Sequence, residues 1–130
     1  MHTASPFPFK NPKNADELVK PAVEGTMAVC RACHSYKVKR LVVTSSVAAV
    51  MEQRPENRPL TWTEEHWSDP EYQLTTSPYF LSKTLAEQAA WNYLKDLPDE
   101  DKFEMVTINP SLVIGKPLHT HDGFASGEIV

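Results

Sequence analysis

The run LVVTS at residues 41–45, introduced by Lys39-Arg40 and followed by a second serine at position 46, decides the fold. A short, continuous apolar run of this kind is typical of a strand in a parallel sheet that is covered on both faces. A second such run occupies residues 103–109, and Asn109-Pro110 ends it. The two runs predict two parallel strands.

Two helices are predicted, one before each of these strands. Residues 14–36 carry apolar side chains at helical spacing, and Asn14 is suited to the N-cap position. Pro21 lies inside this segment and is expected to kink or divide the helix. Ser77-Pro78 is a strong helix start, with a hydroxyl N-cap and proline at the first position, and that helix is expected to run to about Leu94.

The order helix, strand, long connection, helix, strand is half of a doubly wound α/β sheet. A right-handed crossover would pack the helix of residues 78–94 against both strands. Two parallel strands alone leave open edges and an apolar face that is largely uncovered. The sequence therefore predicts part of a Rossmann-like doubly wound parallel sheet, the second half of a nucleotide-binding domain.

The connection over residues 47–76 is long and polar, and no regular structure is expected in it. Loops of that length inside compact domains are usually functional or disordered. Trp62, Trp67 and Tyr72 lie in this connection. They either line a substrate pocket or pin the loop to the domain, and the sequence favours neither.

Composition narrows the class of protein. The 130 residues carry a formal net charge of -4 without a run of like charges, which argues against a broad nucleic-acid surface. No apolar stretch approaches the roughly 20 residues that cross a bilayer, and the first residues lack the cationic start of a secretory signal. Two cysteines do not make a disulfide framework, so a reducing compartment, the cytoplasm, is expected.

Two short motifs are weaker. Cys30 and Cys33 have C-x-x-C spacing, but they fall within the first helix on its apolar stripe, which favours buried structural cysteines over a redox pair. His119-Thr120-His121-Asp122 lacks further ligands at metal-binding spacing and favours a solvated loop. No metal is predicted.

Candidate chemistry lies at the ends of the predicted elements. Tyr79 and Lys83 are four residues apart at a helix start, so both side chains emerge on one face. The lysine ammonium and the positive end of the helix both favour the phenolate, which predicts a Tyr79 pKa below its usual value of about 10. The spacing alone is more typical of an ordinary aromatic–cation pair on a helix than of a catalytic pair. Ser45 and Ser46 follow a strand at the carboxyl edge, where open parallel sheets bind ligands.

These motifs together resemble a known family. Residues 43–46 (VTSS) and 79–91 (YFLSKTLAEQAAW) are similar to the extended short-chain dehydrogenase/reductases, in particular the dihydroflavonol reductase and cinnamoyl-CoA reductase group of the NAD-dependent epimerase/dehydratase superfamily. Residues 2–6 resemble the end of that family's fourth strand, and residues 20–26 resemble the helix after it. Residues 109–115 resemble the segment after its sixth strand. The likeness covers nearly the whole chain, with the motifs in the same order.

The resemblance implies an enzyme that reduces a ketone or aldehyde to an alcohol with NADP or NAD. Tyr79 would be the general acid, Lys83 would hold the nicotinamide ribose and lower the Tyr79 pKa, and Ser46 would bind the substrate oxygen. The cofactor-binding residues implied are Thr3, Ala4, Ser5, Thr44, Ser45, Tyr79, Lys83, Pro110, Ser111 and Leu112. The expected partner is a small carbonyl substrate, and neither nucleic acid nor a membrane is expected.

The chain also departs from the family. The four glycines, at positions 25, 115, 123 and 127, cannot form the glycine-rich turn that holds the pyrophosphate. The residue that separates NAD from NADP is absent with that turn. Ala28 stands where many extended members have asparagine, and Lys116 separates Gly115 from Pro117. The last residues, 126–130, resemble the beginning of a helix in the substrate domain.

We therefore expect residues 1–130 to be a partial nucleotide-binding domain, with the substrate domain truncated after about residue 125, and to be inactive alone. Two other functions stay open. A sugar-nucleotide epimerase or dehydratase shares the Tyr–Lys pair, and a truncated, non-catalytic remnant would explain the lack of a glycine-rich turn. The continuation AEQAAW at residues 86–91 favours the reductase group over the epimerases.

Overall fold

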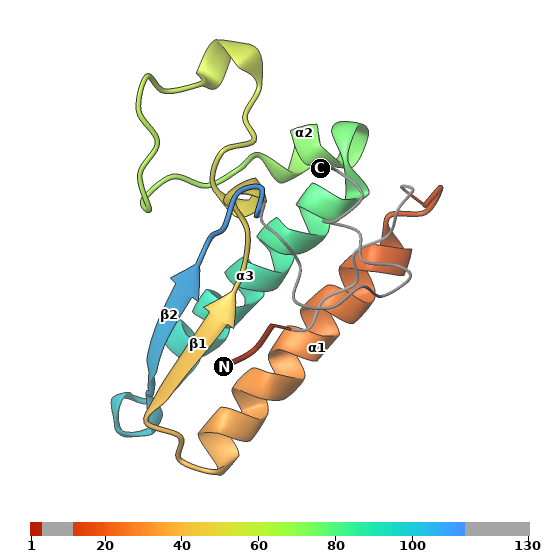
Figure 1. Ribbon diagram of the computed structural model, residues 1–130. Helices are drawn as coiled ribbons and strands as arrows, with labels where there is room; N and C mark the ends of the chain where they lie inside the picture. The colour runs from red at the N-terminus through yellow and green to blue at the C-terminus, as the bar shows by residue number, and fades with distance from the viewer. Residues whose placement is uncertain (4–11, 114–130) are drawn as a thin grey trace.

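The computed structural model describes residues 1–3 and 12–113. Its helices are α1 (Asp16–Ser35), α2 (Pro70–Thr76) and α3 (Pro78–Asp96), and its strands are β1 (Arg40–Thr44) and β2 (Glu104–Ile108). Three short 3-10 helices complete it: η1 (Val47–Ala49), η2 (Pro55–Asn57) and η3 (Asp99–Asp101). Figure 1 shows the two strands side by side with α3 behind them and α1 at its flank.

The strands pair in parallel, as predicted, with Arg40 opposite Glu104 and Thr44 opposite Ile108. A further parallel bridge joins His2 to Val43 on the other edge of β1. The His2 N–H donates to the Val42 carbonyl over 2.8 Å, and the Thr44 N–H donates to the His2 carbonyl over the same distance. β1 therefore has neighbours on both edges, and the first residues lie where the resemblance places the end of another strand.

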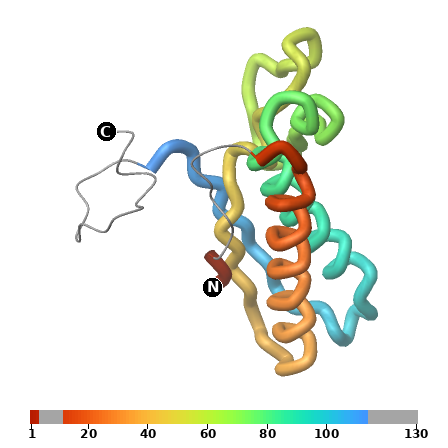
Figure 2. The backbone as a smooth tube through the Cα atoms, turned by 90° about the vertical axis from the view of Figure 1, so that its right-hand side faces the viewer, coloured from red at the N-terminus to blue at the C-terminus, as the bar shows by residue number. Residues whose placement is uncertain are grey.

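Both long helices cover the same face of the sheet, as Figures 1 and 2 show. The core between them contains side chains from both helices, both strands and the residue before β2: Cys30, Cys33, Leu41, Val43, Ala90, Phe103 and Met105. On the other face of β2, Val106 is 43% exposed and Ile108 is 50% exposed. In the part of the chain that the structure describes, the sheet is thus packed on one side only, as two strands of a larger doubly wound sheet would be.

Nearby polar side chains accept hydrogen bonds from backbone N–H groups at the starts of both long helices. The Ser77 hydroxyl accepts a hydrogen bond from the Phe80 N–H at 3.3 Å, which confirms it as the N-cap of α3. The Asn14 side chain accepts from the Asp16 N–H at 3.0 Å, although Ala15 occupies the N-cap position of α1. α1 is continuous through Pro21, so the expected division of this helix is wrong. Pro21 and Glu17 are both exposed, and solvent can reach the Glu17 carbonyl that a proline cannot bond.

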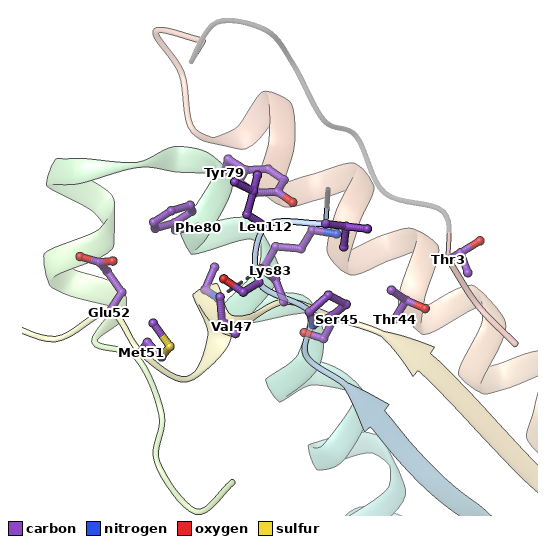
Figure 3. A pocket seen from close by; sticks show the side chains of 15 residues that line it. Thr3, Thr44, Ser45, Val47, Met51, Glu52, Tyr79, Phe80, Lys83 and Leu112 are labelled. Carbon is purple, nitrogen blue, oxygen red and sulfur yellow. Dashed lines mark hydrogen bonds between the residues drawn. The ribbon is translucent and has the colours of Figure 1, made fainter. Parts of the chain in front are cut away.

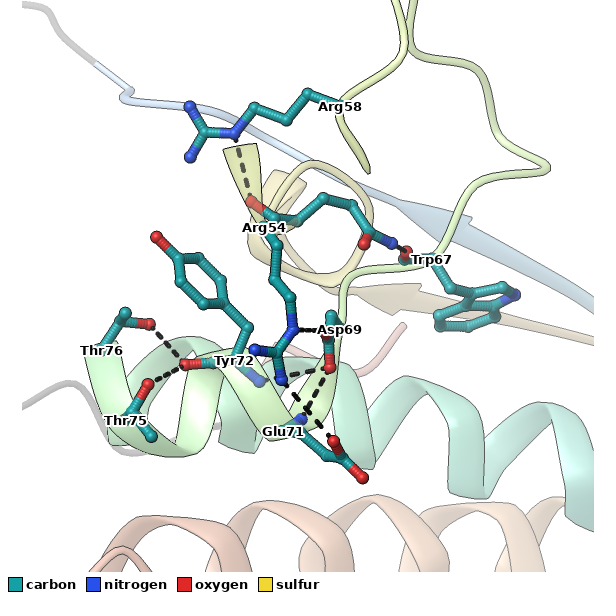
Figure 4. Close-up of polar contacts among 9 residues, drawn as sticks. Arg54, Arg58, Trp67, Asp69, Glu71, Tyr72, Thr75 and Thr76 are labelled. Atoms are coloured by element: carbon teal, nitrogen blue, oxygen red, sulfur yellow. Dashed lines mark hydrogen bonds and ion pairs between the residues drawn. The ribbon is translucent and has the colours of Figure 1, made fainter. Parts of the chain in front are cut away.

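The connection between β1 and α3 is not devoid of regular structure, because η1, η2 and α2 occur in it. Asp69 caps α2 by accepting from the N–H groups of Glu71 and Tyr72, and the Arg54 Nε donates to its other oxygen at 3.0 Å (Figure 4). The Tyr72 N–H, together with Arg54, holds the Asp69 pKa below its usual value. A polar segment thus gains order from caps and ion pairs that a hydrophobic pattern does not indicate.

The aromatic residues of this connection do not line the main pocket, and the contacts of the two tryptophans lie within the connection itself. Gln53 Nε2 donates to the Trp67 carbonyl at 2.5 Å. The Trp62 ring packs edge-on against His66, with ring centroids 5.6 Å apart. Neither tryptophan, nor Tyr72, is among the residues that line the pocket described below. Lining of this pocket is therefore not observed for these side chains, and attachment of the loop to the rest of the domain stays a prediction.

Candidate active site

A pocket of about 570 Å³ opens at the carboxyl ends of β1 and β2. Small-molecule sites commonly have volumes of about 300–1,000 Å³, and open parallel sheets bind their ligands at this edge. The pocket is lined by Thr3, Thr44, Ser45, Ser46, Val47, Ala48, Met51, Glu52, Tyr79, Phe80, Lys83, Pro110, Ser111, Leu112 and Val113. Figure 3 shows their side chains around one space, with Thr3 and Thr44 at one end and Met51, Glu52 and Phe80 at the other.

The residues predicted from the sequence come together here. All those that the structure describes line this pocket: Thr3, Thr44, Ser45, Ser46, Tyr79, Lys83, Pro110, Ser111 and Leu112. They come from the first residues, β1 and the turn after it, α3, and the segment after β2. Ala4 and Ser5 lie outside the described residues. The crossover through α3 and the parallel pairing of the strands produce this convergence.

Tyr79 and Lys83 occupy the first two turns of α3, and the Lys83 Nζ lies 5.6 Å from the centre of the Tyr79 ring. Burial raises the pKa of Tyr79 above its usual value and lowers that of Lys83. The predicted lowering of the Tyr79 pKa is therefore wrong for the described chain, because removal of the phenolate from water outweighs the nearby positive charges. At neutral pH, Tyr79 carries its proton and can donate it.

The two serines after β1 differ in their surroundings. The Ser46 hydroxyl oxygen caps η1 by accepting from the Ala48 N–H at 3.1 Å. Because a hydroxyl has one proton and two lone pairs, Ser46 can still donate a hydrogen bond into the pocket. The Ser45 hydroxyl is buried and has no hydrogen-bond partner among the described residues. A buried hydroxyl without a partner costs about 1–3 kcal/mol, which makes Ser45 a candidate for contact with a bound ligand.

A buried polar network that sequence reasoning missed holds the two strand ends together. Asn109 Nδ2 donates to the Ser46 carbonyl at 3.0 Å and to the Glu87 carboxylate at 2.8 Å. Glu87 is 5% exposed and also accepts from the Trp91 indole N–H at 3.3 Å. The only sequence signals were Glu87, one turn beyond Lys83, and an asparagine before a proline, which indicated nothing more than a strand end.

The other lining residues that the sequence did not indicate are Val47, Ala48, Met51, Glu52, Phe80 and Val113. Most of them give one end of the pocket an apolar wall, with Glu52 as its only charged side chain. Five of them lie in the connection after β1 or at the end of the described segment, and Phe80 lies in α3 beside Tyr79. Because irregular segments carry no periodicity, nothing in the sequence indicates which of their side chains face a ligand.

The weaker motifs take no part in the pocket. Cys30 and Cys33 are free and buried, and burial raises the pKa of Cys30 to about 11, so these are the structural cysteines that were predicted. Within residues 1–3 and 12–113, no three His, Cys, Asp or Glu side chains are grouped as metal ligands. His119 and His121 lie outside the described residues. None of the described helices is long and apolar enough to span a membrane.

Comparison with known proteins shows the family to which the chain belongs. The model of the NAD dependent epimerase/dehydratase family matches residues 1–129. Dihydroflavonol 4-reductase of Medicago sativa is 40% identical over 120 residues, which cover 88% of this chain and 52% of that protein. Cinnamoyl-CoA reductase CAD2 of Medicago truncatula is 42% identical over 121 residues, covering 91% of this chain and 36% of that protein.

Solved structures give the same result. The yeast methylglyoxal/isovaleraldehyde reductase Gre2, complexed with NADPH, superposes with a TM-score of 0.73 at 35% identity, over 91% of this chain and 37% of that one. The fold is therefore part of a Rossmann-like parallel α/β sheet, and the pocket lies at its strand ends. The chain belongs to the NAD-dependent epimerase/dehydratase family, and it spans between about a third and about half of the length of these relatives.

Proposed function

We propose that the protein that carries this chain is an NADP- or NAD-dependent reductase of the short-chain type, which converts a ketone or aldehyde to an alcohol. The observation that supports this most is the convergence of Ser46, Tyr79 and Lys83 on one pocket at the strand ends. The relatives named above include reductases of carbonyl compounds, which favours this reaction over sugar-nucleotide epimerisation.

The pocket residues fit the nicotinamide end of such a cofactor. In this proposal, Lys83 holds the ribose, and the segment from Pro110 to Leu112 lies against the ring. The Ser45 hydroxyl, buried without a partner among the described residues, would gain one from the cofactor. Bound nicotinamide supplies the hydride. The NADPH complex of the yeast relative favours NADP, whereas this chain has no glycine-rich turn to hold the pyrophosphate.

In the proposed reaction, Tyr79 donates its phenolic proton to the substrate oxygen as that oxygen gains negative charge. A phenol with the ordinary pKa of about 10 already carries its proton at neutral pH, and burial raises the Tyr79 pKa further. The Lys83 ammonium, 5.6 Å from the ring centre, stabilises the phenolate that remains. Ser46 donates a second hydrogen bond to the same oxygen and thereby orients the carbonyl.

The substrate would occupy the end of the pocket opposite Thr3. Met51 and Phe80 contribute apolar surface there, beside the carboxylate of Glu52, which favours a carbonyl compound with an apolar or aromatic body. The two free, buried cysteines suit a reducing compartment such as the cytoplasm.

The substitution Tyr79→Phe tests the proposal in the full-length natural protein. We expect carbonyl reduction to fall by about 10²–10⁴-fold, because general acid catalysis typically contributes that much. NADPH binding should be retained, since the ring still packs. Tyr36, which is 83% exposed, provides the matched control Tyr36→Phe. Reduction by Tyr79→Phe within twofold of the unsubstituted protein would remove Tyr79 from the mechanism. Conversion of a sugar nucleotide without net cofactor consumption would identify an epimerase instead.

A further inference from the structure

One backbone carbonyl beside the pocket accepts three side-chain hydrogen bonds. The Ala48 carbonyl accepts from Ser68 Oγ at 2.7 Å, from Gln73 Nε2 at 2.7 Å and from Thr84 Oγ1 at 3.1 Å. The donors come from the segment before α2, from α2 itself and from α3. Ser68 is 2% exposed, and Gln73 and Thr84 are fully buried. The Ala48 carbonyl is thus bonded to side chains that lie 20, 25 and 36 positions further along the chain.

The same residue, Ala48, is bonded to the proposed catalytic serine. Its N–H donates to Ser46 Oγ at 3.1 Å. That bond occupies a lone pair of the hydroxyl and leaves the hydroxyl proton to be donated. The rest of this turn is held by the segment after β2, because Asn109 Nδ2 donates to the Ser46 carbonyl and the Val47 N–H donates to the Pro110 carbonyl. The position of Ala48 therefore determines where the Ser46 hydroxyl points.

Of the three donor side chains, Gln73 is the one that makes no second hydrogen bond among the described residues. The Thr84 hydroxyl also lies 3.2 Å from the Phe80 carbonyl, and the Ser68 hydroxyl accepts from the Glu52 N–H at 2.8 Å. Gln73 Nε2 donates to the Ala48 carbonyl, and Gln73 Oε1 is buried without a hydrogen-bond partner among the described residues. Burial of an unpaired amide oxygen is unfavourable. If this position had only a packing role, an apolar side chain of the same size would therefore be more stable there.

We propose that Gln73 is a positioning residue for catalysis: it binds the Ala48 carbonyl, and the backbone of Ala48, whose N–H binds Ser46 Oγ, holds the Ser46 hydroxyl in the orientation that donates to the substrate oxygen. Ser68 and Thr84 support the same peptide. In this way α2, which is part of the connection between β1 and α3, influences the position of the reacting carbonyl. This inference rests on the proposed function, in which Ser46 contacts the substrate.

The decisive variant is Gln73→Met, which keeps the volume of the side chain and removes both its donor and its unpaired oxygen. Because the second loss offsets the first, we expect the thermal midpoint to change little. Misplacement of a reacting group costs activity steeply, so we expect kcat for carbonyl reduction to fall roughly tenfold or more. The dissociation constant for NADPH should not change. Thr75→Val is the matched control, because the Thr75 hydroxyl bonds within α2 to the Tyr72 carbonyl.

A double-mutant cycle with Ser46→Ala in the full-length protein separates positioning from general stability. If Gln73 acts through Ser46, Gln73→Met will cause no further loss of kcat in the Ser46→Ala background. An undiminished loss in that background, or a wild-type kcat for Gln73→Met alone, would overturn the inference. So would a loss of activity that follows a large fall in the thermal midpoint. A wild-type rate for Ser46→Ala itself would instead refute the proposed role of Ser46, and this inference with it.

Discussion

At the scale of single residues, Tyr79 illustrates how burial and charge oppose each other. The spacing of Tyr79 and Lys83 places both on one helix face, and their charges alone would lower the tyrosine pKa. In the folded chain, burial raises it instead. Lys83 is itself desolvated, which lowers its own pKa. A protonated acid beside a cation suits reduction, in which the tyrosine starts with its proton and ends without it.

The substitution Lys83→Met tests the electrostatic part of this pair. Loss of the ammonium removes a charge that favours the phenolate, so the Tyr79 pKa should rise further. Since reduction needs the protonated tyrosine, the alkaline limb of the kcat profile should move to higher pH. Steady-state rates across a pH series check this, with Lys95→Met, an exposed position in the last turn of α3, as the control. A limb that stays in place while NADPH affinity falls would assign Lys83 a ribose-holding role only.

At the scale of elements, α3 supplies most of the proposed chemistry, and its start is determined by the Ser77 cap. Phe80 donates its N–H to Ser77, and Pro78 occupies the first helical position. A hydroxyl cap satisfies one of the unpaired donors at a helix start, where Tyr79 also lies. The cap therefore contributes both to stability and to the position of the catalytic turn.

We expect Ser77→Ala to lower the free energy of unfolding by about 1 kcal/mol, the typical cost of losing a hydroxyl N-cap. Chemical denaturation of the full-length protein measures this change. The control is Thr61→Ala, which alters an exposed hydroxyl outside any helix. An unfolding free energy equal to that of the control variant would show that the cap contributes nothing.

At the scale of the whole molecule, the described sheet is packed on one face, and Val106 and Ile108 of the other face remain exposed. The relatives that the chain matches are about two to three times as long. The pocket contains the residues proposed to meet the nicotinamide and the substrate, but the chain has no glycine-rich turn for the pyrophosphate. The 130-residue chain thus carries one end of the proposed cofactor site.

We therefore expect residues 1–130, purified alone, to bind neither NADPH nor NADH tightly and to show no carbonyl reductase activity. The pyrophosphate contributes much of the affinity in nucleotide-binding sheets of this kind, and the apolar strand face invites aggregation. Calorimetric titration with each cofactor, beside a thermal unfolding scan, measures both properties. Micromolar binding together with one cooperative transition would show that the 130 residues form a complete functional domain.

The sequence by itself determined the features that depend on short spacings along the chain. These are the two strands, the capped start of α3, the buried cysteines and the Tyr79–Lys83 pair, because helix and strand geometry places residues two, three or four apart in known directions. Tertiary structure decided the rest. The direction of the Tyr79 pKa shift depends on every segment that excludes water from the phenol. The three bonds to Ala48 and the Glu87–Asn109 contact join residues more than 20 positions apart or lie in irregular segments, and no local pattern encodes such contacts.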